Sequence, residues 1–156
     1  MLVQDITTSP VITIAPHATI REVAQLMRQH SISGLPVVDS AGKVVGIVTE
    51  IDLITRHAPP RQPQYIPLLW GLIPMRLDDY STYKEQIRHI LAVYVEQLMT
   101  KDPATVRPGD TLEHAAELMI RPGHHSLPVV ENGKLVGIVT RTDLVRVIED
   151  LEMEEE

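Results

Sequence analysis

Apolar positions between residues 20 and 27 recur at intervals of three and four, the spacing of one face of an α-helix. Thr19 precedes this stripe and Glu22 follows three residues later, a capping-box pair that predicts a helix start after Thr19. Short apolar runs at 13–14, 34–38 and 44–48 predict strands, with a polar turn at 39–43 between the last two. A second helix is expected from residue 50 or 51 to about 56. The predicted order is β-α-β-β-α.

The same pattern returns later in the chain. With a shift of 92 residues, Thr13 aligns with Thr105 and Thr19 with Thr111, and one deletion in a turn then changes the shift to 91. The stretch GKVVGIVTEIDL (42–53) thereby aligns with GKLVGIVTRTDL (133–144), and nine of these twelve positions are identical. We therefore expect equivalent elements at 105–106, 112–120, 127–130, 135–139 and 142–149.

The repeat determines the expected fold. One unit of about 45 residues is too small to bury an adequate hydrophobic core, whereas two such units packed face to face can do so. We predict an α+β fold in which two β-α-β-β-α repeats form a pseudo-two-fold pair with equivalent clefts between them. The predicted segments are repeat one at 1–54, an insertion at 55–97, repeat two at 98–149 and an acidic tail at 150–156.

The insertion breaks the symmetry of the two repeats. Five prolines between residues 59 and 74 argue against regular structure in its first half. From 83 to 99 the apolar residues have the spacing of an amphipathic helix that leads directly into repeat two. Trp70 and its apolar neighbours form either a satellite core or a self-association surface, and a dedicated partner site is the less favoured reading.

Composition limits the possible partners and chemistry. The 156 residues include no cysteine, which excludes disulfides, thiolate metal sites and cysteine nucleophiles. The formal net charge of −7 argues against nucleic acid and anionic membranes as partners. The first residues do not have the pattern of a signal peptide, and the apolar stretch at 66–75 is too short to span a bilayer. We expect a soluble, cytoplasmic protein.

The duplicated T-x-x-D pattern carries the candidate chemistry. Each copy brings a threonine and an aspartate to the N-terminus of a helix, where free N–H groups, a hydroxyl and a carboxylate can hold sugar hydroxyls and phosphate. The same spacing is also that of a capping box that requires no ligand, and both roles can hold together. The two copies are Thr49 with Asp52, and Thr140 with Asp143.

Each repeat has a T-h…P…T-h…A…LM pattern, followed by LPVVDSAGKVVGIVTEIDL in the first and LPVVENGKLVGIVTRTDL in the second. These stretches resemble CBS domains, and a tandem pair of them resembles a Bateman module. The resemblance covers about 4–53 and 98–147, which leaves out the insertion and the tail. It implies clefts that bind AMP, ADP, ATP or S-adenosylmethionine, a regulatory role without catalysis, and assembly as a homodimer. In the family, the aspartate of T-x-x-D accepts hydrogen bonds from the ribose hydroxyls.

The resemblance also implies where the adenine would lie. Each base would rest against the first short strand of a repeat and the bend before the Leu-Pro pair, where backbone groups read its edge. The implied nucleotide-binding residues are Thr13, Ile14, Ser33, Gly34, Pro36, Thr49 and Asp52 in repeat one, and Thr105, Val106, His125, Ser126, Pro128, Thr140, Arg141 and Asp143 in repeat two.

The two clefts differ in charge. Glu50 follows the threonine in the first copy and Arg141 in the second, so we expect the Thr140/Arg141/Asp143 cleft to be the better phosphate site, although Arg141 could equally be a surface charge. Arg56, His57 and Arg61 are further candidates for phosphate contact. The pair His124–His125 lacks ligand spacing, and we expect His125 to line a cleft and no metal to bind. No catalytic motif is present in the sequence.

These observations favour a stand-alone, non-enzymatic sensor that binds an adenine-containing ligand and regulates an unidentified effector protein. The alternative is a ligand-free structural or interaction module that acts through its dimer face or its insertion. An enzyme of unrecognised type is the least favoured hypothesis.

Overall fold

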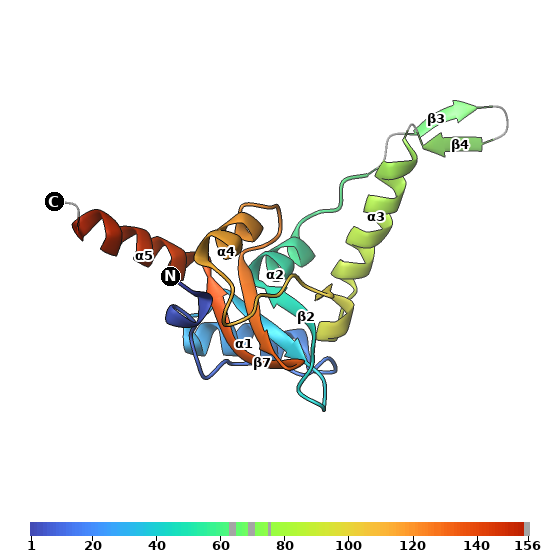
Figure 1. Cartoon of the computed structure of the whole chain (residues 1–156). Helices are drawn as coiled ribbons and strands as arrows, with labels where there is room; N and C mark the ends of the chain where they lie inside the picture. Colours follow the sequence, from blue (N-terminus) through green and yellow to red (C-terminus); the bar gives the residue numbers. More distant parts are fainter. Residues whose placement is uncertain (63–64, 69–70, 75, 155–156) are drawn as a thin grey trace.

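The computed structural model describes residues 1–62, 65–68, 71–74 and 76–154, and it confirms an α+β fold with two repeats (Figure 1). In repeat one, a capping box starts α1 (Ile20–His30), as predicted. Thr19 donates its N–H to the Glu22 carboxylate over 2.6 Å, and Glu22 returns its N–H to the Thr19 hydroxyl over 3.3 Å. β1 (Gly34–Val38) and β2 (Val44–Thr49) form an antiparallel hairpin, and α2 (Glu50–His57) follows directly.

Repeat two has the same order. α4 (Leu112–Met119) precedes the antiparallel hairpin of β6 (Ser126–Glu131) and β7 (Lys134–Thr140), and α5 (Arg141–Glu154) continues five residues past the predicted end at 149. The predicted first strand of each repeat is reduced to a single parallel bridge, Ile14 to Val37 and Val106 to Val129. Both repeats therefore keep the β-α-β-β-α order with a very short first strand.

Each repeat completes its core with a segment that precedes the other repeat. Val3, in the 3-10 helix Val3–Asp5, is fully buried in the core of repeat two, and its N–H donates to the carbonyl of Asp110 over 2.9 Å. Val95, in the equivalent 3-10 helix Val95–Gln97, is fully buried in the core of repeat one and donates to the carbonyl of Ala18 over 2.9 Å. The two repeats thus exchange their leading segments, which joins them into one folded unit.

The exchange explains a glycine in each repeat. The leading segment of repeat two forms β5 (Thr100–Lys101), which pairs antiparallel with β2, and Thr8 forms the equivalent bridge to Ile138 in β7. A Cβ added at Gly137 would overlap the Thr7 side chain, and one added at Gly46 would overlap the Met99 side chain. Both strands carry glycine at this position, where a side chain of the crossing segment lies close above the strand.

The insertion forms an arm, and its structure differs from two predictions. Despite the prolines, β3 (Tyr65–Leu68) and β4 (Gly71–Pro74) form an antiparallel hairpin, because both strands of a two-stranded sheet are edge strands, where proline is tolerated. The helix α3 spans Leu77–Ile90, whereas 83–99 was predicted. After Ile90, Ala92, Val95 and Leu98 of the segment that leads into repeat two pack into the core of repeat one, and this packing overrides the helical pattern. Leu69 and Trp70 lie outside the described residues.

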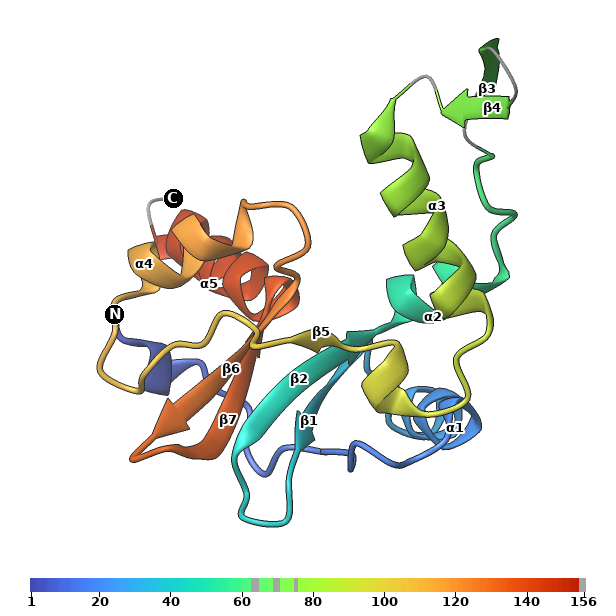
Figure 2. The same ribbon diagram turned by 90° about the vertical axis from the view of Figure 1, so that its right-hand side faces the viewer.

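The arm extends away from the body of the two repeats, with the hairpin at its far end (Figures 1 and 2). It is attached through α3, which packs on α2. Arg56 Nε donates to the carbonyl of Ala92 over 3.1 Å, and the N–H of Arg61 donates to Gln86 Oε1 over 2.9 Å. In the part of the chain that the structure describes, no helix is long and apolar enough to cross a membrane.

Candidate functional site

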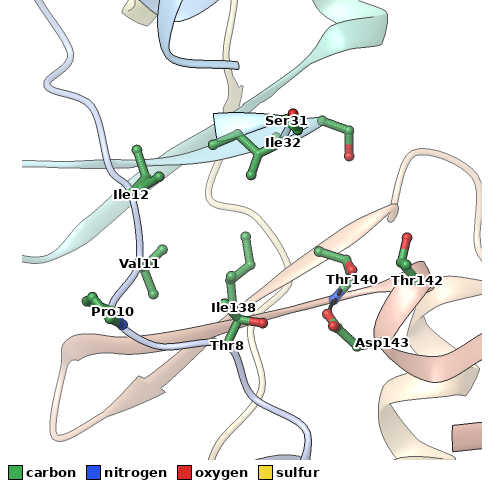
Figure 3. Close-up of a pocket in the computed structure, with 12 residues that line it drawn as sticks. Thr8, Pro10, Val11, Ile12, Ser31, Ile32, Ile138, Thr140, Thr142 and Asp143 are labelled. Atoms are coloured by element: carbon green, nitrogen blue, oxygen red, sulfur yellow. Dashed lines mark hydrogen bonds between the residues drawn. The ribbon is translucent and has the colours of Figure 1, made fainter. Parts of the chain in front are cut away.

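A pocket of about 260 Å³ lies between the two repeats. One wall consists of the Pro10–Ile12 segment and residues 31–34 of repeat one, and the other consists of Ile138, Thr140, Thr142 and Asp143 of repeat two, with Thr8 beside them. In Figure 3 the Ile32 and Ile138 side chains approach from opposite walls, and the Thr140–Asp143 pair closes one end. The pocket therefore combines two apolar faces with a polar end, which suits a flat base that carries a sugar.

The polar end of this pocket is a capping box at the start of α5. One carboxylate oxygen of Asp143, Oδ2, accepts the N–H of Thr140 over 2.8 Å and the Thr140 hydroxyl over 2.7 Å. The capping role is thus confirmed for Asp143. The second oxygen, Oδ1, has no partner among the described residues and remains available to accept hydrogen bonds.

A second pocket of about 300 Å³ adjoins the first at the pseudo-two-fold axis and shares Ser33, Thr140 and Thr142 with it. The N-termini of α2 and α5 meet there, and Glu50 and Arg141 both line it. The first-turn N–H groups at 142 and 143 have no intrahelical acceptor, because they precede the first i to i−4 bond. A ligand in the first pocket can extend a negatively charged group toward this helix start.

Asp52 occupies the equivalent position in repeat one. Its Oδ2 accepts the Thr49 N–H over 2.7 Å and the Thr49 hydroxyl over 3.0 Å, so the capping box is duplicated. Burial raises the pKa of Asp52, against the opposing effects of these two hydrogen bonds and of the nearby His89 and His125. His89 belongs to α3, so the insertion contributes to the surroundings of this carboxylate.

The raised pKa of Asp52 predicts a pH effect on stability. A carboxyl whose folded pKa lies above its unfolded value stabilises the fold when protonated, and this contribution is lost as the pH rises through the folded pKa. Asp52→Asn does not titrate, so the free energy of unfolding of the wild type should fall relative to this variant as the pH rises above about 4, near the ordinary aspartate value. Urea unfolding of both proteins between pH 3 and 7 measures this difference, with Asp143→Asn as the matched capping variant. A constant difference for Asp52→Asn would contradict the assignment.

The structure brings together only part of the predicted site. Ser33 and Gly34 of repeat one line the same pocket as Thr140 and Asp143 of repeat two, so the pocket is built across the repeats. His125, which the sequence analysis grouped with Thr140 and Arg141, lines the second pocket together with both of them and with Thr49.

Other predicted residues support the fold. The Ile14 and Val106 side chains are buried in the two cores, and their backbone groups are paired, for example Ile14 N–H to the Pro36 carbonyl over 3.1 Å. Buried Pro128 accepts the equivalent bond from Val106 over 3.0 Å. Five more predicted residues do not line the pocket: Thr13, Thr105, Pro36, Pro128 and Ser126. Thr13 is half-buried, Thr105 lies at a separate surface hollow, and the other three are buried.

The candidate phosphate ligands lie in two different parts of the molecule. The Arg141 guanidinium donates from Nη2 to the carbonyl of Met119 over 3.1 Å, at the end of α4, while its side chain lines the central pocket. Arg56 and His57 lie at the C-terminal end of α2, about 10 Å along the helix from its N-terminus at a rise of about 1.5 Å per residue. Together with Arg61, which packs beside α3, they are not positioned to contact a phosphate at the start of α2 or α5.

Sequence reasoning missed most of the apolar wall. Ile138 precedes Thr140 by two residues in β7, and strand alternation therefore places both on one face, a signal that could have identified it. Val11, Ile12 and Ile32 lie in irregular segments without such a signal. Within the described residues no group of three His, Asp or Glu side chains is arranged to hold a metal ion.

The sequence profile of the CBS domain matches residues 3–58 and 95–150. A protein of Methanocaldococcus jannaschii, the uncharacterized protein MJ1426, is 32% identical over 154 residues, which cover 95% of this chain and 91% of that protein. The chloroplastic CBS domain-containing protein CBSX2 of Arabidopsis thaliana is 29% identical, and the match covers 92% of this chain and 60% of that protein.

Solved structures show the same fold. The crystal structure of CBSX2 in complex with AMP matches with a TM-score of 0.77 and 27% identity, covering 96% of this chain and 97% of that one. The CBS domain pair of MJ0100, in complex with 5′-methylthioadenosine and S-adenosyl-L-methionine, matches with a TM-score of 0.70, 27% identity and the same coverages.

Proposed function

Because this chain belongs to the CBS domain family, we propose that it is a regulatory module that binds an adenine-containing ligand in the pocket shared by its two repeats. The observation that carries the proposal is the lining of that pocket. It joins the apolar walls around Ile32 and Ile138 to the hydroxyl and carboxylate of Thr140 and Asp143. The complexes of CBSX2 with AMP and of MJ0100 with methylthioadenosine and S-adenosylmethionine support this ligand class.

Each part of an adenosine has a complementary group in the pocket. The base would lie between Ile32 and Ile138, which cover its faces. The backbone groups of Val11 and Ile12 have no hydrogen-bond partner among the described residues and can pair with the base edge. Asp143 Oδ1 would accept hydrogen bonds from the ribose hydroxyls, because an ionised carboxylate oxygen is a pure acceptor.

The position of the pocket suggests how binding would regulate. Its walls come from different repeats, so a ligand that contacts both favours the arrangement in which the walls are correctly spaced. The ligand shifts the population toward that arrangement by its difference in affinity for the two arrangements. In the proposed role, an effector protein recognises this arrangement of the two repeats. The module acts as a homodimer and has no catalytic activity.

Thermal denaturation and calorimetry with AMP, ADP, ATP and S-adenosylmethionine test the proposal. A ligand that binds only the folded state at 100 times its dissociation constant should stabilise it by about 2.7 kcal/mol. At least one adenine compound should raise the midpoint, and guanosine monophosphate, which presents a different base edge, should raise it less. No response to any adenine compound would instead favour the structural or interaction module, and turnover of a ligand by the purified protein would indicate an enzyme.

A further inference from the structure

The first pocket, which lies between Ile32 and Ile138, opens into the second pocket at the polar end of the site. Ser33, Thr140 and Thr142 line both pockets. In Figure 3, Thr140 and Thr142 lie beside Asp143 at this end. When the ribose is held by Asp143, the second pocket of about 300 Å³ is the adjoining space for the group on its 5′ carbon. The residues of the second pocket therefore determine which 5′ group the site can bind.

The ionisable residues of the two pockets include more acids than bases. They are Asp143 in the first pocket, and Glu50, Arg141 and His125 in the second. From the sequence, Glu50 and Arg141 were expected in different clefts, and the structure places both in one pocket. The phosphate of AMP carries a charge of about −1.5 to −2 at pH 7, so it would enter a space that already holds two carboxylates. Like charges placed together weaken binding and disfavour such a ligand.

The two opposite charges of the second pocket do not neutralise each other. Among the described residues the Glu50 carboxylate has no ion-pair or hydrogen-bond partner, and both Glu50 and Arg141 are exposed. Arg141 uses Nη2 to donate to the carbonyl of Met119 over 3.1 Å, which leaves Nε and Nη1 as free donors in the part of the chain that the structure describes. Opposite charges that share a pocket without pairing can both bind a ligand that carries one group of each sign.

We propose that this site prefers an adenosine whose 5′ group ends in a zwitterionic α-amino acid, as in S-adenosylmethionine, over an adenosine phosphate. The inference rests on the proposed function and assigns Glu50 and Arg141 as the residues that determine specificity. Glu50 accepts hydrogen bonds from the ammonium group, and Arg141 donates to the carboxylate beside the first-turn N–H groups of α5. The sulfonium of S-adenosylmethionine adds a positive charge at the end that Asp143 and Glu50 make negative.

A matched pair of ligands tests the preference. S-Adenosylhomocysteine and 5′-methylthioadenosine both carry an uncharged sulfur on the same adenosine, and only the former has the amino-acid group. In calorimetry on the full chain near neutral pH, S-adenosylhomocysteine should bind at least about tenfold more tightly, because it gains hydrogen bonds between charged groups. S-Adenosylmethionine should bind more tightly still, and AMP and ATP more weakly than methylthioadenosine.

Variants of the two charged residues identify the source of the preference. Glu50→Gln keeps the shape of the side chain and removes its charge, so it should weaken S-adenosylhomocysteine about tenfold, leave methylthioadenosine unchanged and strengthen AMP. Arg141→Gln should also weaken S-adenosylhomocysteine and leave methylthioadenosine unchanged. Glu149→Gln is the matched control, because it makes the same change in net charge at an exposed position of α5 that lines neither pocket. It should change the affinity for none of these ligands.

The outcomes separate this inference from the proposed function. If methylthioadenosine or AMP binds as tightly as S-adenosylhomocysteine, the site binds adenine compounds without the proposed preference, and this inference is overturned. A Glu50→Gln variant with the wild-type ratio of the two affinities would overturn it too, since Glu50 would then be an ordinary solvated charge. If no adenine compound binds to the wild type, the proposed function fails as well. Thermal midpoints of the unliganded variants close to that of the wild type establish that they are folded.

Discussion

Asp143→Ala should remove the stabilisation of this protein by AMP, or by whichever adenine compound binds the wild type most tightly. The change deletes the acceptor proposed for the ribose hydroxyls. Each hydrogen bond to a charged group contributes about 1.5–3 kcal/mol, and a loss of 1.4 kcal/mol is a factor of ten in affinity. The dissociation constant measured by calorimetry should therefore rise at least about tenfold, and the thermal response should largely disappear.

Asp52→Ala is the matched control for this experiment. It removes an equivalent capping box, in which Asp52 accepts from Thr49 over 2.7 and 3.0 Å, so both variants should lose about 1 kcal/mol of stability from the cap. Asp52 is not part of the lining of the pocket that contains Asp143, and Asp52→Ala should keep most of the ligand response. The assignment of the site would be wrong if Asp52→Ala lost the response and Asp143→Ala kept it.

Gly137→Ala should destabilise the fold, even though alanine usually stabilises an ordinary strand position relative to glycine. The new Cβ would overlap the Thr7 side chain, and it would also lie 3.3 Å from the Thr8 carbonyl oxygen. Thr7 cannot rotate away freely, because its hydroxyl donates to the carbonyl of Val3 over 2.7 Å. Overpacking of this kind costs about 1–3 kcal/mol, which exceeds the roughly 0.4–1 kcal/mol gained from a less flexible unfolded chain.

Chemical denaturation of Gly137→Ala should show the loss, and a second change should reverse much of it. Thr7→Ser removes the methyl group in the way of the new Cβ but keeps the hydroxyl that bonds Val3. Gly137→Ala combined with Thr7→Ser should therefore be more stable than Gly137→Ala alone. Gly46→Ala should lose less, since the atom that it overlaps belongs to the flexible Met99 side chain. Equal stability of Gly137→Ala and the wild type would show that the crossing segments are loosely packed.

Much of the fold could be predicted because it is encoded locally and twice. The capping residues Thr19 and Glu22, the short apolar runs of the hairpin strands and the T-x-x-D starts of α2 and α5 are short-range signals, and the structure confirms each of them. Because each signal occurs in both repeats, it was stronger evidence for its element than a single occurrence would have been. The family followed from the same residues.

The sequence predictions failed or were incomplete where long-range packing determines the conformation or the neighbours of a segment. Ile87 and Ile90 belong to α3, but Val95 and Leu98 continue the same spacing in a 3-10 turn and the chain after it, which the core of repeat one holds in place. No local pattern tells a segment which of two similar cores it will enter. For the same reason the sequence analysis grouped Thr140 only with the bend of its own repeat. The structure places Thr140 beside His125 of that bend in the second pocket, and also beside Ser33 of repeat one in the first.

The exchanged leading segments also determine where this chain can tolerate change. Val3 closes one core and Val95 the other, so neither repeat is complete without residues that belong to the opposite half of the chain. Separate duplication or loss of one repeat would leave a cavity in the hydrophobic core of the remaining repeat. Lengthening the arm between α2 and α3 would leave both hydrophobic cores complete. In such a tandem repeat the insertion can change in length and sequence, whereas the two repeats must be kept together.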